Sequence, residues 1–138
     1  MNMNECLFCK MAAGLIPVIK IYEDDVVLSF LDIGPISDGH TLIIPKKHYE
    51  NIHSCPADFL AQIASRFGKI ANAVTSAMNS DGYNVLCNNG RAAGQVIDHL
   101  HFHIIPRRNN DGVFNRWPSY KYDEGQIEKI AELIRKKF

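Results

Sequence analysis

Alternating histidines near residue 100 constrain the fold of this chain more than any other feature. They alternate with apolar residues in the order His99, Leu100, His101, Phe102, His103, Ile104. Successive side chains of a β-strand point to opposite faces of the sheet, whereas on a helix the three imidazoles would scatter. The pattern therefore predicts a strand with the three imidazoles on one face and an apolar layer on the other.

The length and charge of the chain bound its class. Its 138 residues suit one domain, and no repeat or linker divides them, so we expect a single domain over residues 1–138. Fifteen Lys and Arg balance fifteen Asp and Glu, which argues against nucleic acid or a membrane surface as partner. The N-terminus resembles no export signal and no segment has the length of a membrane span, so we expect a cytoplasmic protein. Its cysteines are then thiols or metal ligands, and we expect Cys55 and Cys87 to be buried thiols.

Apolar periodicity predicts helices and strands in the order α-β-β-β-α-β-β-α. The expected elements are a helix over 6–13, strands over 19–23, 26–31 and 40–45, a helix over 56–79, a strand over 83–87, the histidine strand, and a helix around 127–134 that Asp123 caps. This order indicates an α+β fold, in which one long and two shorter helices pack against an antiparallel sheet of about five strands.

Three interpretations of the histidine row follow from imidazole chemistry. A neutral imidazole, with a pKa of about 6.5, keeps one unprotonated ring nitrogen that can attack phosphorus, and a hydrogen bond to the other nitrogen fixes the tautomer. Alternate histidines on one strand could instead bind a metal ion. A partly buried polar face without function is the third interpretation, but three histidines in register are hard to satisfy without a shared task.

The loop over residues 88–95 precedes the histidine row directly. Its sequence, Asn-Asn-Gly-Arg-Ala-Ala-Gly-Gln, has two glycines that let backbone N–H groups approach a phosphate. Such a segment is by itself an ordinary turn. Its position before the imidazoles favours an anion site, and the absence of a P-loop sequence or a dinucleotide-binding glycine motif argues against those nucleotide-binding folds.

The histidine segment resembles the signature of the histidine-triad (HIT) family, in which three histidines alternate with apolar residues and further apolar residues follow. Residues 99–105 match it as HLHFHII. The stretch CLFCKMAAGLIPVIKIYEDDVVLSFLDIGPISDGHTLIIPKKH is also similar to the family, especially to bacterial members and the nucleoside-phosphoramidase branch. The resemblance covers nearly the whole chain and weakens after about Arg108. It implies the HIT fold and a homodimer, with the 56–79 helix and the 83–87 strand as the expected interface.

The resemblance also implies hydrolysis or transfer at the α-phosphate of a purine nucleoside phosphoramidate or a dinucleoside polyphosphate, through a covalent nucleotidyl-histidine. The nucleophile would be His101, with His99 and His103 beside it and His40 completing the cluster. The implied nucleotide-binding residues are Asp32 at the ribose, Asn88, Gly94, Gln95, Val96 and His103 at the phosphate, and Phe8, Phe30, Ile33 and Leu42 around the base. Without the resemblance, those four apolar residues would be assigned to the core, Asp32 to a turn and His40 to a strand end.

One position departs from the family pattern. Several members carry Ser or Thr where Val96 stands, and that hydroxyl can assist the phosphate or the leaving group. Protonation of the leaving group and the preferred substrate therefore stay open here. Two other functions also stay open: a nucleotide-binding or regulatory module with little turnover, and a metal-dependent hydrolase, which the lack of a nearby cluster of Asp and Glu disfavours.

A C-x-x-C pair near the N-terminus, Cys6 and Cys9, has the spacing that lets two thiolates reach one tetrahedral zinc ion. Some bacterial HIT proteins complete such a site with a histidine after the Pro-Lys-Lys segment and with the first triad histidine. The corresponding residues here are His48 and His99. The resemblance thus implies a structural zinc site and no metal requirement for catalysis, with two free thiols or a redox pair as alternatives.

Overall fold

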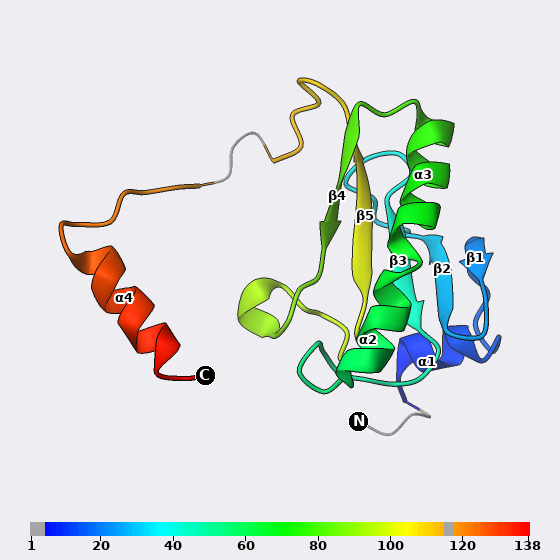
Figure 1. Cartoon of the computed structure of the whole chain (residues 1–138). Helices are drawn as coiled ribbons and strands as arrows, with labels where there is room; N and C mark the ends of the chain where they lie inside the picture. The colour runs from blue at the N-terminus through cyan, green and yellow to red at the C-terminus, as the bar shows by residue number, and fades with distance from the viewer. Residues whose placement is uncertain (1–4, 115–117) are drawn as a thin grey trace.

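A five-stranded antiparallel sheet forms the centre of the protein, in a computed structural model that describes residues 5–114 and 118–138 (Figure 1). The strand order is β1-β2-β3-β5-β4. The strands are β1 (Lys20–Glu23), β2 (Val27–Leu31), β3 (Thr41–Pro45), β4 (Gly82–Leu86) and β5 (Phe102–Arg107). The helices are α1 (Leu7–Ala12), α2 (Ala57–Ala64), α3 (Phe67–Met78), the 3-10 helix η1 (Arg91–Ala93) and α4 (Gln126–Arg135). The predicted α+β fold with an antiparallel sheet of five strands is confirmed.

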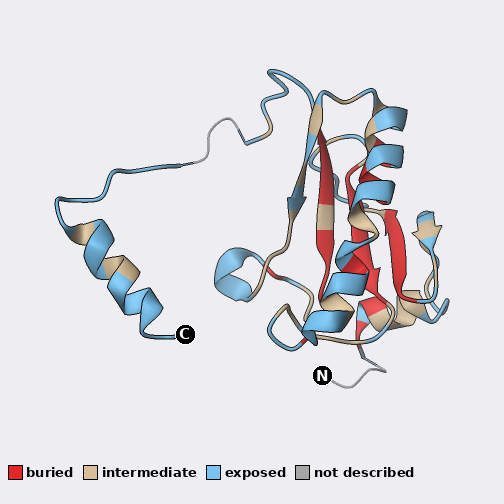
Figure 2. Cartoon of the chain, viewed as in Figure 1, coloured by how far each residue is buried: buried red, intermediate tan, exposed pale blue. Residues whose placement is uncertain are grey.

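The sheet separates two apolar clusters, because alternate strand residues face opposite sides. On one side, residues of α2 and α3 pack on strand residues such as Val27, Ile43 and Ile104. On the other side, Phe8 of α1 packs with strand residues such as Leu28. Strands β2 and β3 are almost fully buried (Figure 2). The second, smaller cluster borders the histidines and so positions the site.

The predicted 56–79 helix is wrong as one continuous element, because α2 ends at Ala64 and the chain leaves the helical hydrogen-bond pattern at Arg66 before α3 begins. The Arg66 N–H bonds the carbonyl of Ile63, three residues back, and the Ser65 hydroxyl donates to the Gln62 carbonyl at 2.6 Å. The Arg66 guanidinium also reaches out of the helix to Asp24, at 2.8 Å. Both residues keep right-handed helical dihedrals, so the apolar periodicity continues through the break and conceals it in the sequence.

The first two triad histidines do not lie on a strand, which corrects the expectation that all three do. Strand β5 begins at Phe102, whose pair with Ile43 is the last between β3 and β5. The Lys46 N–H donates to the Val26 carbonyl, on the β2 side of β3. Because backbone groups of successive strand residues point to opposite sides, the backbone of Pro45 faces β5. Proline has no N–H to continue that ladder. The Leu100 N–H bonds the carbonyl of Tyr49 instead.

The alternation of faces nevertheless holds across the start of β5. Leu100, Phe102 and Ile104 are all buried in the cluster under α2 and α3. The rings of His99 and His101 both contact Phe8, on the opposite side. The prediction of one apolar face and one imidazole face is therefore confirmed, although only the third histidine is in a strand.

The C-terminal helix α4 stands away from the sheet (Figure 1), whereas the sequence led us to expect it packed there. None of its residues is buried. The expected cap is also wrong: Gly125 occupies the N-cap position without a side-chain hydrogen bond, and Asp123 contributes its backbone carbonyl to the Gln126 N–H. Across residues 5–114 and 118–138, no helix has both the length and the apolar character needed to cross a bilayer.

Candidate functional site

The histidines predicted as functional lie in two adjoining clusters. In the first, Cys6, Cys9, His48 and His99 bring one potential ligand atom each within 4.8 Å of the others. The second consists of Asp32, His40 and His103. His101 lies beside both, because its ring centroid is 5.2 Å from that of His103 and its Nδ1 bonds the backbone of His99.

The first cluster has the dimensions of a tetrahedral zinc site. With Zn–S bonds of about 2.3 Å and Zn–N bonds of about 2.05 Å, tetrahedral angles separate sulfur from nitrogen by about 3.5 Å and two nitrogens by about 3.3 Å. The His99 Nδ1 lies 3.4 Å from Cys6 Sγ and 3.5 Å from Cys9 Sγ. The His48 Nδ1 lies 3.3 Å from Cys9 Sγ and 3.2 Å from His99 Nδ1. The four residues therefore fit the ion that their types suggested.

Hydrogen bonding prepares His99 as a ligand. Its Nε2 lies 2.9 Å from the carbonyl of Pro45, which can only accept, so Nε2 carries the proton and Nδ1 keeps its lone pair. Burial lowers the pKa of His99 to about 4, so the ring is neutral near pH 7. Burial also raises the pKa of Cys9 to about 11, which a bound cation would oppose by stabilising the thiolate.

Local helix chemistry brings the two cysteines together. Cys6 is the N-cap of α1, and its Sγ accepts the backbone N–H of Cys9 at 3.4 Å. Residues three apart share one side of a helical turn, which sets both sulfurs toward the histidines. The helix ends at Ala12, where Gly14 follows with a φ of 74°, a value that glycine adopts without strain.

The hydrogen bonds of His101 define its reactive nitrogen. Its Nδ1 lies 2.7 Å from the carbonyl of His99, which accepts the Nδ1 proton. The Nε2 of a neutral ring then carries a free lone pair. Since His101 lines a cleft, this nitrogen is a candidate nucleophile.

A chain of hydrogen bonds gives His103 the opposite tautomer to that of His101. The Ile36 N–H donates to Nδ1 of His40 at 3.1 Å, so the His40 proton is on Nε2. That Nε2 lies 2.8 Å from Nδ1 of His103, which therefore accepts, and the His103 proton is on its Nε2. The His103 Nε2 is buried and has no partner within the described part of the chain. A lone pair on His101 and an N–H on His103 thus stand on neighbouring rings.

Burial keeps the two histidines of this second cluster uncharged near neutrality. It lowers the pKa of His103 to about 4, with further lowering by His101 and His40. It also lowers the pKa of His40, although the Asp32 carboxylate, 3.6 Å from His40 Nε2, acts in the other direction. The tautomers assigned from the hydrogen bonds are therefore those of neutral rings.

A cleft of about 660 Å³ opens in front of His101 and His103. Most of the predicted nucleotide-binding residues line it: Phe8, Phe30, Asp32, Ile33, Leu42, Asn88, Gly94, Val96 and His103. The side chain of Ile33 is fully exposed and that of Val96 is 75% exposed, so both lie at the rim. The structure thus gathers residues from α1, β2, β3 and the loop before the triad around one apolar cavity.

Two predicted residues lie behind the cleft rather than on its wall. The buried Gln95 amide accepts the Gly90 N–H at 2.8 Å and donates to the carbonyls of Glu50 and Ile97. This closes the 90–97 loop on itself. His40 reaches the cleft only through His103. Contact of Gln95 or His40 with a ligand stays a prediction.

Sequence reasoning missed further residues that line the cleft: Leu7, Met11, Ile16, Pro17, Val18, Ile19, Leu31 and Ile97. The spacing of Leu7, Phe8 and Met11 along one short helix was a usable signal for a common face. The sequence does not indicate that residues 16–19 line a cleft, because an apolar segment there would be predicted as ordinary core.

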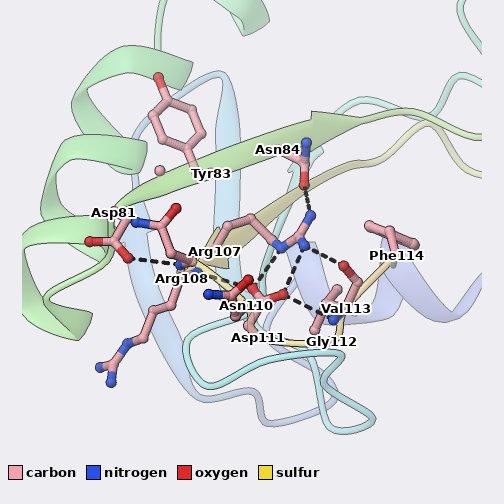
Figure 3. A pocket seen from close by; sticks show the side chains of 12 residues that line it. Asp81, Tyr83, Asn84, Arg107, Arg108, Asn110, Asp111, Gly112, Val113 and Phe114 are labelled. Atoms are coloured by element: carbon pink, nitrogen blue, oxygen red, sulfur yellow. Dashed lines mark hydrogen bonds and ion pairs between the residues drawn. The ribbon is translucent and has the colours of Figure 1, made fainter. Parts of the chain in front are cut away.

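A second cavity, of about 640 Å³, lies where β4 begins and β5 ends (Figure 3). The Arg107 guanidinium crosses it and bonds Asp111 at 2.8 Å, Asn84 at 2.8 Å and the carbonyl of Val113. Its hydrogen bonds go to the protein, and no histidine or cysteine lines this cavity. These contacts close the turn after β5, so the chemically equipped cleft is the one at the triad.

Comparison with known proteins identifies relatives of this chain. The family description "HIT domain" matches residues 13–110. The adenylylsulfatase HINT3 of Arabidopsis thaliana is 50% identical over 137 residues, covering 96% of this chain and 69% of the relative. The adenosine 5′-monophosphoramidase hnt1 of Schizosaccharomyces pombe is 44% identical over 133 residues, covering 96% and 97%.

Solved structures agree with the sequence relatives. A protein from Streptococcus mutans superposes with a TM-score of 0.92 and 42% identity, covering 99% of this chain and 86% of the other. A zinc-bound histidine triad family protein from Mycobacterium smegmatis superposes with a TM-score of 0.77 and 35% identity, covering 98% and 99%. The matched domain and these relatives, which each cover at least 96% of this chain, show that the chain belongs to the histidine-triad (HIT) family.

Proposed function

We propose that this protein is a nucleotide hydrolase or transferase that cleaves at the α-phosphate of purine nucleoside phosphoramidates or dinucleoside polyphosphates through a nucleotidyl-His101 intermediate. One observation carries the proposal: His101, with a free Nε2, and His103, with its proton on Nε2, have ring centroids 5.2 Å apart, and both residues line an apolar cleft. Relatives named adenosine 5′-monophosphoramidase and adenylylsulfatase support a nucleotide substrate.

In the proposed first step the lone pair of His101 Nε2 forms a bond to the α-phosphorus. The bond from phosphorus to the leaving group breaks at the same time, and the leaving group takes its electron pair. Positive charge develops on the imidazole, and the His99 carbonyl at its Nδ1–H stabilises that charge. In the second step water attacks phosphorus, the electron pair returns to Nε2, and the water proton leaves with the released group or with solvent.

The proposed phosphate site combines His103 with the 88–96 loop. The unpaired His103 Nε2–H is a donor for a non-bridging oxygen. Gly94 has a φ of 89°, a conformation that costs other residues strain, and it turns the backbone at the cleft wall next to Val96. Asn88 adds an amide at that wall, while the internal bonds of Gln95 keep the loop in place.

The proposed nucleoside site lies at the apolar end of the cleft. Phe8 and Phe30 meet edge to face at 5.7 Å, and with Ile33 and Leu42 they form a slot that fits a purine ring. The Asp32 carboxylate also lines the cleft, 3.6 Å from His40 Nε2, and we place the ribose hydroxyls beside it. Its Oδ1 accepts the Gly34 N–H at 2.8 Å, which fixes the carboxylate.

The cleft residues bear on which leaving groups to test. Within the described residues, no Ser, Thr, Tyr or Lys lines the cleft. Groups that depart as stable anions need no proton, whereas an amine must take one from solvent or from the N–H of His103. We therefore include adenylyl sulfate among the substrates to test, which the name of the Arabidopsis relative supports.

We further propose a structural zinc ion held by Cys6, Cys9, His48 and His99. The tetrahedral spacing of the four ligand atoms supports it, as does the zinc-bound relative from Mycobacterium smegmatis. When bound, the ion supplies a link between α1, the segment after β3 and the start of the triad. The Nε2 of His101 stays free for the reaction.

A homodimer through the β4 edge completes the proposal. Strand β4 is an outer strand of the sheet, and Tyr83 and Val85 on it are 47% and 39% exposed. An outer strand with exposed apolar side chains is suited to pair with a second copy. We retain a single domain over residues 1–138, the cytoplasm as its compartment, and no nucleic-acid or membrane partner as expectations from charge and length.

A quenched reaction tests the proposal directly. The protein is mixed with adenosine 5′-phosphoramidate or adenylyl sulfate, quenched within milliseconds to seconds by a denaturant at alkaline pH, where the P–N bond survives, and analysed by mass spectrometry for an adenylyl adduct on the 99–105 peptide. We expect the adduct with the natural chain, none with His101→Ala, and a normal adduct with the control His53→Ala, an exposed histidine outside both clusters. Full turnover by His101→Ala would contradict the proposed nucleophile, and AMP binding without turnover would favour a binding module.

A further inference from the structure

Phe8 connects the metal-type cluster to the nucleotide cleft. It lies between Cys6 and Cys9 in the same turn of α1, and it is only 3% exposed. Its ring packs edge to face on His101 at 5.2 Å and on His99 at 5.8 Å. The same ring is part of the cleft wall. Any shift of the turn that carries the two cysteines must therefore move a wall of the cleft.

A second connection runs through His99. Its ring Nδ1 belongs to the Cys and His cluster, and its backbone carbonyl holds the Nδ1–H of His101 at 2.7 Å. The position of the His99 ring thus fixes the carbonyl that orients the candidate nucleophile. Two independent contacts, one through Phe8 and one through His99, lead from the same cluster to His101.

Helix α1 has little stability of its own, so its position depends on tertiary contacts such as the packing of Phe8 on the sheet. It is six residues long, well below the length at which an isolated helix is stable in water. Its N-cap bond to sulfur is a weak one, at 3.4 Å. An ion bound to both cysteines would fix this turn to His48 and His99, which belong to other segments.

We propose that metal occupancy of the Cys6, Cys9, His48 and His99 cluster and nucleotide binding in the cleft are thermodynamically coupled, with Phe8 as the positioning residue that couples them. The inference rests on the proposed zinc site and the proposed nucleotide cleft. The metal orders the turn in advance, so a nucleotide that packs on Phe8 loses less conformational entropy on binding. Coupling between sites is reciprocal, so the nucleotide must strengthen metal binding by the same factor.

Isothermal titration calorimetry measures both halves of the coupling. AMP is titrated into the zinc-loaded full-length chain and into the chelator-stripped chain, and zinc is titrated with and without saturating AMP. We expect stripping to weaken AMP binding about tenfold, and AMP to strengthen zinc binding by the same factor. Equal AMP affinity for the two forms would overturn the coupling, whereas no AMP binding to either form would overturn the proposed cleft and the coupling with it.

Two matched variants separate coupling from ordinary wall packing. Phe8→Leu removes the aromatic edge from the turn that carries the cysteines, whereas Phe30→Leu removes the neighbouring ring from β2. We expect both to weaken AMP binding, but only Phe8→Leu to reduce the tenfold ratio between loaded and stripped forms toward one. An unchanged ratio in Phe8→Leu would overturn the role of this residue.

A spectroscopic measurement needs no stripped protein. With Co²⁺ in place of zinc, the visible bands of a cobalt–thiolate site report the geometry at Cys6 and Cys9. We expect AMP to shift these bands in the natural chain and in Phe30→Leu, and to leave them unchanged in Phe8→Leu. Bands that stay unchanged when AMP saturates the natural chain would contradict the coupling even if the stripped protein does not fold.

Discussion

The Nε2 of His40 lies 2.8 Å from the Nδ1 of His103, and the proton between them belongs to His40 because its other nitrogen accepts the Ile36 N–H. This assignment leaves His103 with an Nε2–H that has no partner among the described residues, without any positive charge on the pair. His40 does not line the cleft, so we regard it as a positioning residue.

The first prediction concerns this relay. His40→Ala removes the donor, frees the His103 ring to change tautomer, and should slow single-turnover release of AMP roughly a hundredfold, the usual effect of losing one well-placed donor. His40→Gln retains an amide donor and should recover part of the rate. Nitrogen-15 spectra of the His103 ring check the tautomer directly, and a fully active His40→Ala protein with unchanged spectra would contradict the relay.

The second prediction is a pH dependence of stability. Burial depresses the pKa of His103 to about 4 in the fold, while the unfolded chain titrates near 6.5. The unfolded state therefore binds more protons between these values, and the contribution of His103 is complete above pH 6.5 and is lost as the pH falls toward 4. The loss is at most about 1.4 kcal/mol per pH unit.

Urea unfolding of the zinc-loaded protein between pH 7.5 and 4.5 measures this slope. The comparison that isolates the histidine is His103→Gln, whose side chain does not titrate. We expect its unfolding free energy to fall less steeply than that of the natural chain. Parallel slopes would mean that the ring is not protected from protons in the fold.

The third prediction concerns the metal cluster. Cys9→Ser replaces one ligand, and Cys87→Ser replaces a half-buried thiol outside the cluster. We expect only the first to lose stoichiometric zinc by atomic absorption. At free zinc a hundred times the dissociation constant, the lost binding corresponds to about 3 kcal/mol and a melting temperature lower by roughly 10 °C. Equal zinc content in both variants would contradict the ligand assignment.

The fourth prediction concerns Asp24, which binds the guanidinium of Arg66 at the break between α2 and α3. Burial raises the pKa of Asp24, but bonds from the Val27 and Val26 N–H groups and from Arg66 outweigh this and lower the pKa overall. Asp24→Ala leaves those donors without their acceptor and should destabilise the fold by about 2–4 kcal/mol. Asp25→Ala, in the same turn but with a 91% exposed side chain, should change stability by less than about 0.5 kcal/mol. Equal effects in chemical denaturation would contradict this role for Asp24.

Much of the site could be predicted because its chemistry depends on residue type at fixed spacing. The alternation of histidines with Leu100 and Phe102 assigned the two faces, and the C-x-x-C pair named two members of the cluster. His48, distant in sequence from Cys9, entered only through the family resemblance. Periodicity alone cannot say which histidine folds back onto a cysteine pair.

Other features were beyond reach because they depend on tertiary contacts. Ser65 and Arg66 keep helical dihedrals, so the break between α2 and α3 leaves no trace in the apolar pattern. The side-chain amide of Gln95 is a group that could bind a phosphate, yet its NH2 donates to the Glu50 and Ile97 carbonyls instead. The periodicity of α4 predicted a helix correctly, but an amphipathic pattern does not specify the surface it packs on.

Pro45 shapes the site although it neither lines the cleft nor belongs to the Cys and His cluster. By ending the β3–β5 ladder, it frees the chain before Phe102, and its carbonyl then captures the Nε2–H of His99. The first imidazole of the row is thereby turned to the cysteines while the second remains at the cleft. A single imino acid thus separates two histidines of one short motif, one facing the proposed metal site and the other the proposed site of bond cleavage, whereas an uninterrupted strand would have held both on a common surface.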